Sequence, residues 1–223
     1  MTYQTVVFDL DGTLVDTLPD IAASFNSVLE QEGYPVHPTK VYRKFVGWGL
    51  SRTLELALPE PLAMEEFNRI LSRIQQAYIS DPISRSRLYP GIVELMDTLV
   101  EMNIRTVVYT NKDQHIASLI VSGLLNGCPV DRVIGRSVAF PPKPDPSALM
   151  AYMAEAPSSS ILMVGDSTVD VETSLRANVD FIGAGWGYGS VEELVLAGSR
   201  TNFTAPADLH RYLVEKKEVN DDE

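Results

Sequence analysis

Hydrophobic positions follow two different spacings along the chain, and the order of these spacings predicts its fold. Short apolar runs rich in β-branched residues predict buried strands, whereas apolar residues three and four apart predict helices. The predicted strands begin at residue 5 and cover 105–110, 132–135, 161–166 and 181–184. The helices that alternate with them cover 92–102, 115–125, 147–155, 169–178 and 207–216. This alternation predicts an α/β fold with right-handed crossovers and a parallel sheet covered on both faces.

Residues 16–87 show helical spacing only. The predicted helices run from residue 18 to a stop at Gly33, then over 39–46, 52–58 and 64–78. The first strand lies before this block, and the remaining strands of the sheet follow it. We therefore expect two parts, a core made of residues 1–15 and 88–223 and a helical domain inserted at 16–87.

Composition fits a globular protein that works without disulfides. The chain has 223 residues, of which 45% are hydrophobic and 22% are charged, and it contains one cysteine, Cys128. No apolar run approaches the roughly 20 residues of a membrane span, and no secretory signal precedes the first strand. A single cysteine fits a reducing compartment, so we expect a cytoplasmic location. The sequence leaves a monomer and a homodimer equally open.

The formal net charge of −12 restricts the partners of the protein. An acidic chain is a poor match for nucleic acid or for an anionic membrane, so we expect neither. The same charge opposes an anionic substrate, which would need a local group of cations to hold it.

Two aspartates, Asp9 and Asp11, stand at the carboxyl end of the first strand, and Gly12 follows them. Two carboxylates about 4 Å apart repel each other by about 4 kcal/mol at an effective dielectric constant of about 20. A cation is expected to offset this repulsion, and Mg²⁺ prefers carboxylate oxygens. A helix cap is the simpler interpretation of one aspartate, but it leaves the second without a role.

Other polar residues follow the other predicted strands. Thr110, Asn111 and Lys112 end the second strand, Lys143 lies between prolines after the third, and Asp166 and Asp170 follow the fourth. Each could serve a turn, a cap or a solvated loop when taken alone. Because ligands bind at the carboxyl ends of parallel strands, we expect the whole set at one edge of the sheet. A hydroxyl, an amide, an ammonium and four carboxylates together indicate magnesium-dependent phosphoryl transfer.

The run Asp9-Leu10-Asp11-Gly12-Thr13, followed by Leu14-Val15-Asp16-Thr17, resembles the first motif of the haloacid dehalogenase-like superfamily, and most closely its phosphatases. The resemblance extends over essentially the whole chain. It implies a Rossmann-like parallel-sheet core with an inserted α-helical cap of the C1 type, formed here by residues 16–87. Asn178 stands where many members have glycine, and asparagine tolerates the left-handed turn required there.

The resemblance also implies roles for individual residues. Asp9 would be the nucleophile that forms an aspartyl-phosphate, and Asp11 the general acid and base, kept protonated by its carboxylate neighbours. Thr110 would bind the transferring phosphoryl group with Asn111 beside it, and Lys143 would balance charge on nucleophile and phosphate. Mg²⁺ would be held by Asp9, Asp166, Asp170 and the backbone carbonyl of Asp11.

Two glycine-flanked tryptophans bear on the substrate. Residues 45–50, which include Gly47 and Trp48, and residues 186–190 resemble loops of the phosphoglycolate phosphatases of that superfamily. Gly47, Trp48 and Arg52 are therefore expected to contact the substrate, a small phosphorylated metabolite such as 2-phosphoglycolate. An arginine on a helix is more often simply solvated.

Three alternatives remain. A sugar-phosphate mutase of the same superfamily is disfavoured because its members carry another residue in place of Thr13. An inorganic pyrophosphatase stays open. From a different class, the chain could be a catalytically silent regulator that binds a phosphorylated metabolite, although the expected nucleophile, acid and lysine are all present.

Overall fold

The computed structural model describes residues 3–155 and 160–221. The chain divides into two compact units, one formed by Met1–Val15 with Leu88–Glu223 and the other by Asp16–Arg87. The chain therefore leaves the first unit after its first strand and returns to it more than 70 residues later.

A parallel sheet forms the centre of the larger unit. In the described residues it has six strands in the order β5-β4-β1-β6-β7-β8, and each neighbouring pair is parallel. The strands are β1 (Thr5–Phe8), β4 (Arg105–Asp113), β5 (Arg132–Arg136), β6 (Ile161–Gly165), β7 (Asp180–Ala184) and β8 (Asn202–Phe203). Every residue of β1 is buried, as expected for a central strand covered on both faces.

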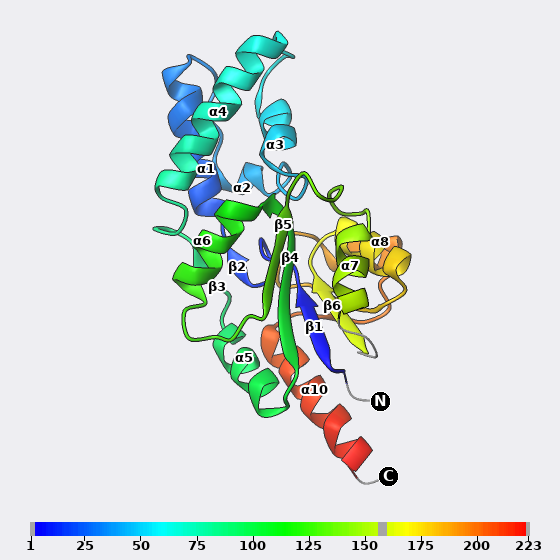
Figure 1. Ribbon diagram of the computed structural model, residues 1–223. Coiled ribbons are helices and arrows are strands. Elements are labelled where there is room, and N and C mark those ends of the chain that lie inside the picture. Colours follow the sequence, from blue (N-terminus) through cyan, green and yellow to red (C-terminus); the bar gives the residue numbers. More distant parts are fainter. Residues whose placement is uncertain (1–2, 156–159, 222–223) are drawn as a thin grey trace. The chain divides into compact units, whose positions relative to one another are not determined.

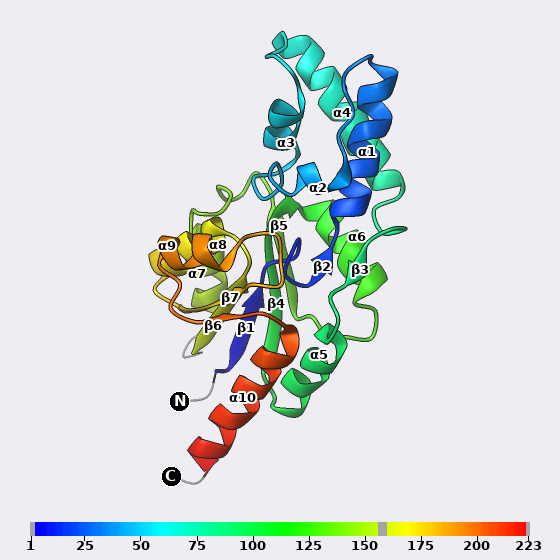
Figure 2. The same cartoon turned by 180° about the vertical axis from the view of Figure 1, so that it is seen from behind.

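Helices cover both faces of this sheet (Figures 1 and 2). On one face lie α5 (Ile92–Glu101), α6 (Gln114–Leu124) and α10 (Pro206–Asp221), and on the other lie α7 (Ser147–Glu155), α8 (Thr168–Ala177) and α9 (Val191–Ala197). Leu149 and Tyr152 of α7 join a core cluster with Val7, Val107 and Met163. The predicted α/β fold with a parallel-sheet core is confirmed.

The register of the central strands determines where the candidate site residues lie. Phe8 of β1 is aligned with Val108 of β4 on one side and with Val164 of β6 on the other. The residues that follow these three positions therefore emerge together at one edge of the sheet. They begin with Asp9, Tyr109 and Gly165.

The smaller unit is helical, with α1 (Leu18–Gln31), α2 (Thr39–Tyr42), α3 (Leu50–Ala57) and α4 (Met64–Ser80). Asn26 of α1 ties this unit together, because its side-chain oxygen accepts hydrogen bonds from the His37 amide at 3.0 Å and the Tyr42 hydroxyl at 2.7 Å. Asp20 is fully buried and accepts hydrogen bonds from the Arg85 amide at 3.0 Å and the Ser86 amide at 2.7 Å. Asp20 thus fixes the start of α1 to the segment that leaves the unit.

Several short elements were not predicted. Strands β2 (Val15–Asp16) and β3 (Arg87–Leu88) pair with each other where the chain passes between the two units. Helix α9 and strand β8 are also additional, and the helix predicted over 39–46 ends at Tyr42. Elements of two to seven residues are too short to show a hydrophobic period. Within the described residues, none of the helices combines the length and the apolar character that a membrane crossing requires.

Candidate active site

Asp9 follows β1 directly and is buried beside a buried lysine. The Lys143 ammonium lies 2.8 Å from Asp9 Oδ1 and 2.6 Å from Asp170 Oδ1, and it also donates a hydrogen bond to the Tyr109 carbonyl at 3.0 Å. Asp9 directly follows β1, Tyr109 belongs to the neighbouring strand β4, and Asp170 lies in the first turn of α8. Lys143 therefore joins the end of β1 to the start of α8.

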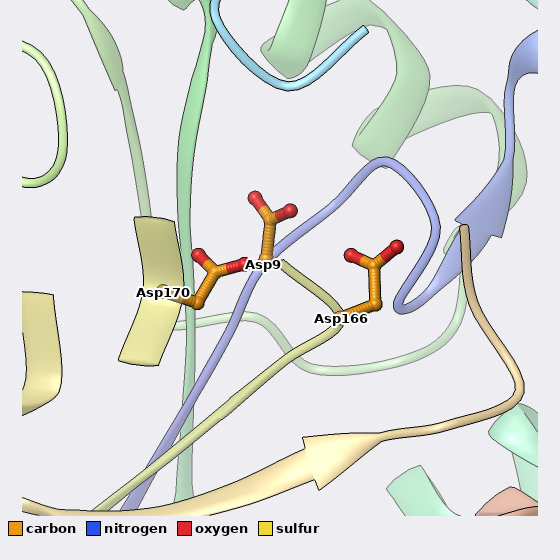
Figure 3. Close-up of side chains that lie close together, drawn as sticks. All are labelled: Asp9, Asp166 and Asp170. Atoms are coloured by element: carbon orange, nitrogen blue, oxygen red, sulfur yellow. The ribbon is translucent and has the colours of Figure 1, made fainter. Parts of the chain in front are cut away.

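Three aspartates converge at this point (Figure 3). Asp9, Asp166 and Asp170 are all buried, and each offers a carboxylate oxygen within 4.8 Å of the others. If all three ionise, their negative charges exceed the single positive charge of Lys143 by about two, and such an excess is costly in a buried site. A cluster of carboxylate oxygens with this charge fits a hard divalent cation.

The protonation of these groups follows from their burial. Loss of hydration, together with the charges of Asp170 and Asp11, raises the pKa of Asp9 to about 7, although Lys143 acts to lower it. Loss of hydration and the charges of Asp9 and Asp170 also raise the pKa of Asp166 well above its usual range. Burial alone would lower the pKa of Lys143, but Asp170 and Asp9 outweigh it and raise this pKa. The lysine therefore stays charged, and the raised pKa values of Asp9 and Asp166 mean that both take up a proton more readily than an exposed aspartate does.

A loop after β7 supports the aspartates from the side. The Trp186 indole donates a hydrogen bond to the Thr13 carbonyl at 2.9 Å, and the Tyr188 amide donates one to Asp166 Oδ2 at 2.6 Å. The Thr13 hydroxyl donates to the other oxygen of Asp166 at 3.1 Å. Both oxygens of Asp166 are thus oriented by groups from distant parts of the sequence. Gly187 packs directly against Gly12 and Asp166. A methyl group added to Gly187 would fall 2.2 Å from the Gly12 carbonyl oxygen and 2.4 Å from Asp166 Cβ.

The Gly187→Ala variant is expected to lose at least about tenfold in activity, because the added methyl group must displace Asp166 or the turn at Gly12. Its free energy of unfolding should fall by about 1–3 kcal/mol. The control is Gly33→Ala at the end of α1, where φ is +77° and nothing lies within 4 Å of the added methyl group. That variant should lose about 1–2 kcal/mol through backbone strain while keeping full activity. Equal loss of activity in both variants would contradict a specific role for Gly187.

The three polar residues at the end of β4 have three different partners. The Thr110 hydroxyl accepts a hydrogen bond from the Lys112 amide at 3.2 Å, which leaves its own proton for another acceptor. The Asn111 side chain donates to the Lys143 carbonyl at 3.0 Å and accepts from the Lys143 amide at 2.7 Å. Asn111 was expected beside the substrate, and in the structure it holds the backbone of the lysine loop. Lys112 reaches Asp11, with 2.9 Å between its ammonium and Asp11 Oδ1.

The pair of Lys112 with Asp11 was missed from the sequence. Lys112 was noted only as part of the strand end, and Asp11 was expected to be kept protonated by neighbouring carboxylates. The side chain of Lys112 is only 5% exposed and faces Asp11, whose side chain is 17% exposed, so a cation lies against this aspartate as well. One feature of the sequence could have indicated this pair, namely a lysine at the end of a buried strand. A lysine buried there needs a carboxylate partner.

The predicted substrate-contact residues Gly47, Trp48 and Arg52 belong to the smaller unit. Gly47 adopts a φ of +107°, which favours glycine, and the neighbouring Trp48 side chain is 52% exposed. The Arg52 guanidinium is exposed and lies 2.6 Å from the Glu55 carboxylate one turn along α3. Within this unit Trp48 is therefore available for contact, whereas Arg52 is already paired.

The structure thus brings together Asp9, Lys143, Asp166 and Asp170 in one cluster. Asp11 and Lys112 form a second pair two residues beyond Asp9, and Thr110 lies at the end of the strand next to β1. The chemistry that this arrangement allows is attack by a buried carboxylate on an electrophile whose negative charge is balanced by cations.

Comparisons with known proteins agree with this geometry. The family model described as haloacid dehalogenase-like hydrolase matches residues 6–184. A phosphoglycolate phosphatase from Caulobacter vibrioides is 32% identical over 189 residues, which cover 82% of this chain and 80% of that protein. One from Rhodospirillum rubrum is 30% identical over 223 residues, covering 94% and 90% respectively. A solved structure from Lactobacillus delbrueckii subsp. bulgaricus has the same fold, with a TM-score of 0.88 at 24% identity over 96% of this chain and 99% of that one.

Proposed function

Because the chain belongs to the haloacid dehalogenase-like hydrolase family and is a phosphatase, we propose that it hydrolyses small phosphomonoesters through a covalent phosphate on Asp9. The observation that carries the proposal is the buried cluster in which Lys143 contacts both Asp9 and Asp170 and Asp166 completes the set. We propose 2-phosphoglycolate as the substrate, since similar proteins from two organisms are phosphoglycolate phosphatases.

The reaction begins with Asp9 as the nucleophile. One of its oxygens attacks phosphorus while the bond from phosphorus to the leaving oxygen breaks, which gives an aspartyl-phosphate and an alcohol. Lys143 would reduce the repulsion between Asp9 and the phosphate dianion, and the Thr110 hydroxyl, which accepts from the Lys112 amide, would donate its own proton to a phosphoryl oxygen. Asp11 gives a proton to the leaving oxygen and then takes one from the water that attacks the aspartyl-phosphate.

We propose that Asp9, Asp166 and Asp170, with the backbone carbonyl of Asp11, hold Mg²⁺. Three buried carboxylates with one lysine among them support this assignment, because oxygen ligands and excess negative charge suit this ion. When bound, the ion would supply positive charge that lets Asp9 and the phosphate approach each other.

Residues 16–87 are proposed to form the cap that selects the leaving group. The exposed Trp48 beside Gly47 supports this role, since an exposed large aromatic side chain in a glycine-flanked turn is suited to contact a ligand. Arg52 is proposed to meet the carboxylate of the substrate by exchanging Glu55 for it.

The test of the proposed function is phosphate release from a panel of small phosphomonoesters, with and without Mg²⁺. The panel contains 2-phosphoglycolate, hexose phosphates, 4-nitrophenyl phosphate and pyrophosphate. Selective, magnesium-dependent turnover of 2-phosphoglycolate is expected. Conversion of a hexose phosphate to its isomer would identify a mutase, preference for pyrophosphate would identify a pyrophosphatase, and absence of turnover in folded protein would leave the silent binder.

Magnesium is also expected to change thermal stability in a pH-dependent way. The pKa of Asp9 is about 7 in the folded protein and about 3.8 in the unfolded chain, so the folded state binds its proton more tightly. Without a divalent cation, this group therefore makes the protein less stable as the pH rises from about 4 through 7. Mg²⁺ at about 100 times its dissociation constant would add about 2.7 kcal/mol at pH 8, which is about 5–10 °C for a chain of this size.

The measurement is the melting temperature at pH 5 and pH 8, with EDTA or with Mg²⁺. The increase caused by Mg²⁺ should be several degrees larger at pH 8, because protons no longer compete for the carboxylates. Glu32, whose pKa is lowered to about 2 chiefly by its hydrogen bond with Arg69, titrates below this range. An equal increase at the two pH values would contradict metal binding by the aspartate cluster.

A further inference from the structure

We propose that Trp186 is a positioning residue for the cation site, which acts by holding the turn at Gly12 and Thr13 against Asp166. The inference rests on the proposed function and goes beyond it, because it gives a role to residues 186–190, hereafter the β7 loop. Neither the proposed reaction nor the proposed cap includes this loop. Its tryptophan is half-buried, and the indole donates its hydrogen bond to backbone, the Thr13 carbonyl.

The β7 loop spans the end of a neighbouring strand. Strands β1, β6 and β7 lie in this order in the sheet, so the strand that ends just before Asp166 lies between the other two. Trp186 follows β7, and Thr13 lies in the turn that follows β1. The hydrogen bond of 2.9 Å from the indole to the Thr13 carbonyl therefore joins segments from two strands that are not neighbours.

Both sides of this connection contact Asp166. The Thr13 hydroxyl donates to Asp166 Oδ1 at 3.1 Å, and the Tyr188 amide donates to Oδ2 at 2.6 Å. A carboxylate oxygen has two lone pairs, so an oxygen that accepts one hydrogen bond keeps a second lone pair for a cation. Hydrogen bonds of this kind orient a metal ligand and strengthen its binding. The indole of Trp186 completes the set, because it fixes the backbone that carries the Thr13 hydroxyl.

The β7 loop is anchored at both ends. The amide of Gly185, the residue before the loop, donates to the Phe203 carbonyl of β8 at 2.8 Å. At the other end, Ser190 and Glu193 form two reciprocal hydrogen bonds at the start of α9, with lengths of 3.0 and 3.2 Å. Trp186 therefore belongs to a segment whose ends are fixed to the sheet and to a helix, and its indole can hold the turn in place.

Removal of the indole N–H should weaken cation binding more than it weakens the fold. Loss of a group that orients a metal ligand typically lowers metal affinity about 10- to 100-fold. Because Trp186 acts on Asp166 through Thr13, we expect the lower end of this range, so the dissociation constant of a divalent cation should rise about tenfold in Trp186→Phe. At saturating Mg²⁺ its kcat should fall less than about threefold, since no reacting group has been removed.

The experiment measures the dissociation constant of Mn²⁺ without substrate, from the free ion detected by electron paramagnetic resonance. Mn²⁺ suits a site of carboxylate oxygens, and Asp166→Asn identifies the binding that belongs to the aspartate cluster. Adding Trp186→Phe to Thr13→Val, which removes the hydroxyl that contacts Asp166, should weaken binding by less than the product of the two single effects.

The matched control is Tyr3→Phe. This substitution also removes a donor on an aromatic ring from a hydrogen bond between distant segments, in this case 2.8 Å to Asp180 at the amino end of β7. Both Tyr3→Phe and Trp186→Phe should melt a few degrees below the unmodified protein. Only Trp186→Phe should bind Mn²⁺ about tenfold more weakly.

The fluorescence of Trp186 provides a second measurement, which remains possible if Trp186→Phe does not fold. The chain has two tryptophans, so Trp48→Phe leaves Trp186 as the only one. Its emission should change on titration with Mg²⁺, because the indole is bonded to the turn that contacts Asp166. Asp166→Asn in the same background should abolish this change.

Two results would overturn the inference while leaving the proposed function intact. One is equal affinity for Mn²⁺ in Trp186→Phe and the unmodified protein, and the other is an equal loss of affinity in Tyr3→Phe. If Trp186→Phe does not fold, an emission of Trp186 that Mg²⁺ leaves unchanged overturns the inference instead. Because binding is measured without substrate, absence of phosphate release by the unmodified protein is a separate result, which would reject the proposed function itself.

Discussion

Asp9→Asn is expected to lower phosphate release by about 10,000-fold or more, because an amide cannot form the covalent phosphate that the reaction requires. The substitution keeps the size of the side chain and removes its negative charge. Steady-state release of phosphate from 2-phosphoglycolate, measured at saturating Mg²⁺, is the appropriate assay.

The melting temperature of Asp9→Asn distinguishes a loss of catalysis from misfolding. The pKa of Asp9 is raised to about 7, so its carboxylate form is unfavourable in the folded protein without a divalent cation. Asp9→Asn should therefore melt at the same temperature as the unmodified protein or higher in EDTA at pH 8. Asp97→Asn, on the exposed face of α5, is the control and should change neither property. More than 1% of normal activity in Asp9→Asn would rule out Asp9 as the nucleophile.

Lys143→Met is also expected to lose most of its activity, but unlike Asp9→Asn it should be less stable than the unmodified protein. The ammonium of Lys143 contacts Asp9, Asp170 and the Tyr109 carbonyl in a buried site. Its removal leaves three buried carboxylates without a protein cation, and breaking a buried ion pair in this way typically costs about 3–5 kcal/mol. Activity should fall about 1,000-fold, since the charge of Asp9 is no longer balanced against the phosphate.

Urea unfolding at pH 8 in EDTA measures the loss of stability in Lys143→Met, and Mg²⁺ should recover part of it without recovering activity. Lys143→Arg should also be inactive, because a planar guanidinium does not fit the position of a compact ammonium between two carboxylates. Arg105→Met, at the opposite end of β4, removes an exposed cation and serves as the control. Normal stability of Lys143→Met would show that the aspartates do not depend on this cation.

The main features of the core could be predicted from the sequence because they depend on local patterns. The apolar runs at Thr5–Phe8 and Ile161–Gly165 became adjacent parallel strands, and the aspartates that follow them lie together at one edge. Asn178 adopts a left-handed conformation with φ of 54° at the end of α8, as expected for an asparagine in place of glycine. A strand period and a residue's intrinsic backbone preference are properties that a sequence carries directly.

Contacts between distant segments could not be predicted. The Tyr188 amide that orients Asp166 is a backbone group, which every residue has, so no residue type signals it. The close packing of Gly187 against Gly12 depends on how two loops meet. The sequence shows a lysine near the end of a strand at position 112, but it does not show that Asp11 is its partner. That pairing depends on the irregular end of β4, which no hydrophobic period indicates. The strands β2 and β3 were missed for a related reason. Each has only two residues, and each forms only because it pairs with the other.

The central claim is that phosphate is carried on Asp9, and borohydride trapping during turnover tests it most directly. Borohydride reduces an acyl phosphate to the alcohol, so an aspartyl-phosphate at residue 9 becomes homoserine, which mass spectrometry locates in the peptide. Asp11→Asn, in which the second half-reaction should be slow, is the protein to use with 4-nitrophenyl phosphate and Mg²⁺, because 4-nitrophenolate leaves without a proton from Asp11. The account predicts homoserine at position 9 only, dependent on substrate and absent from Asp9→Asn. Homoserine at another aspartate, or phosphate release that continues in Asp9→Asn, would contradict it.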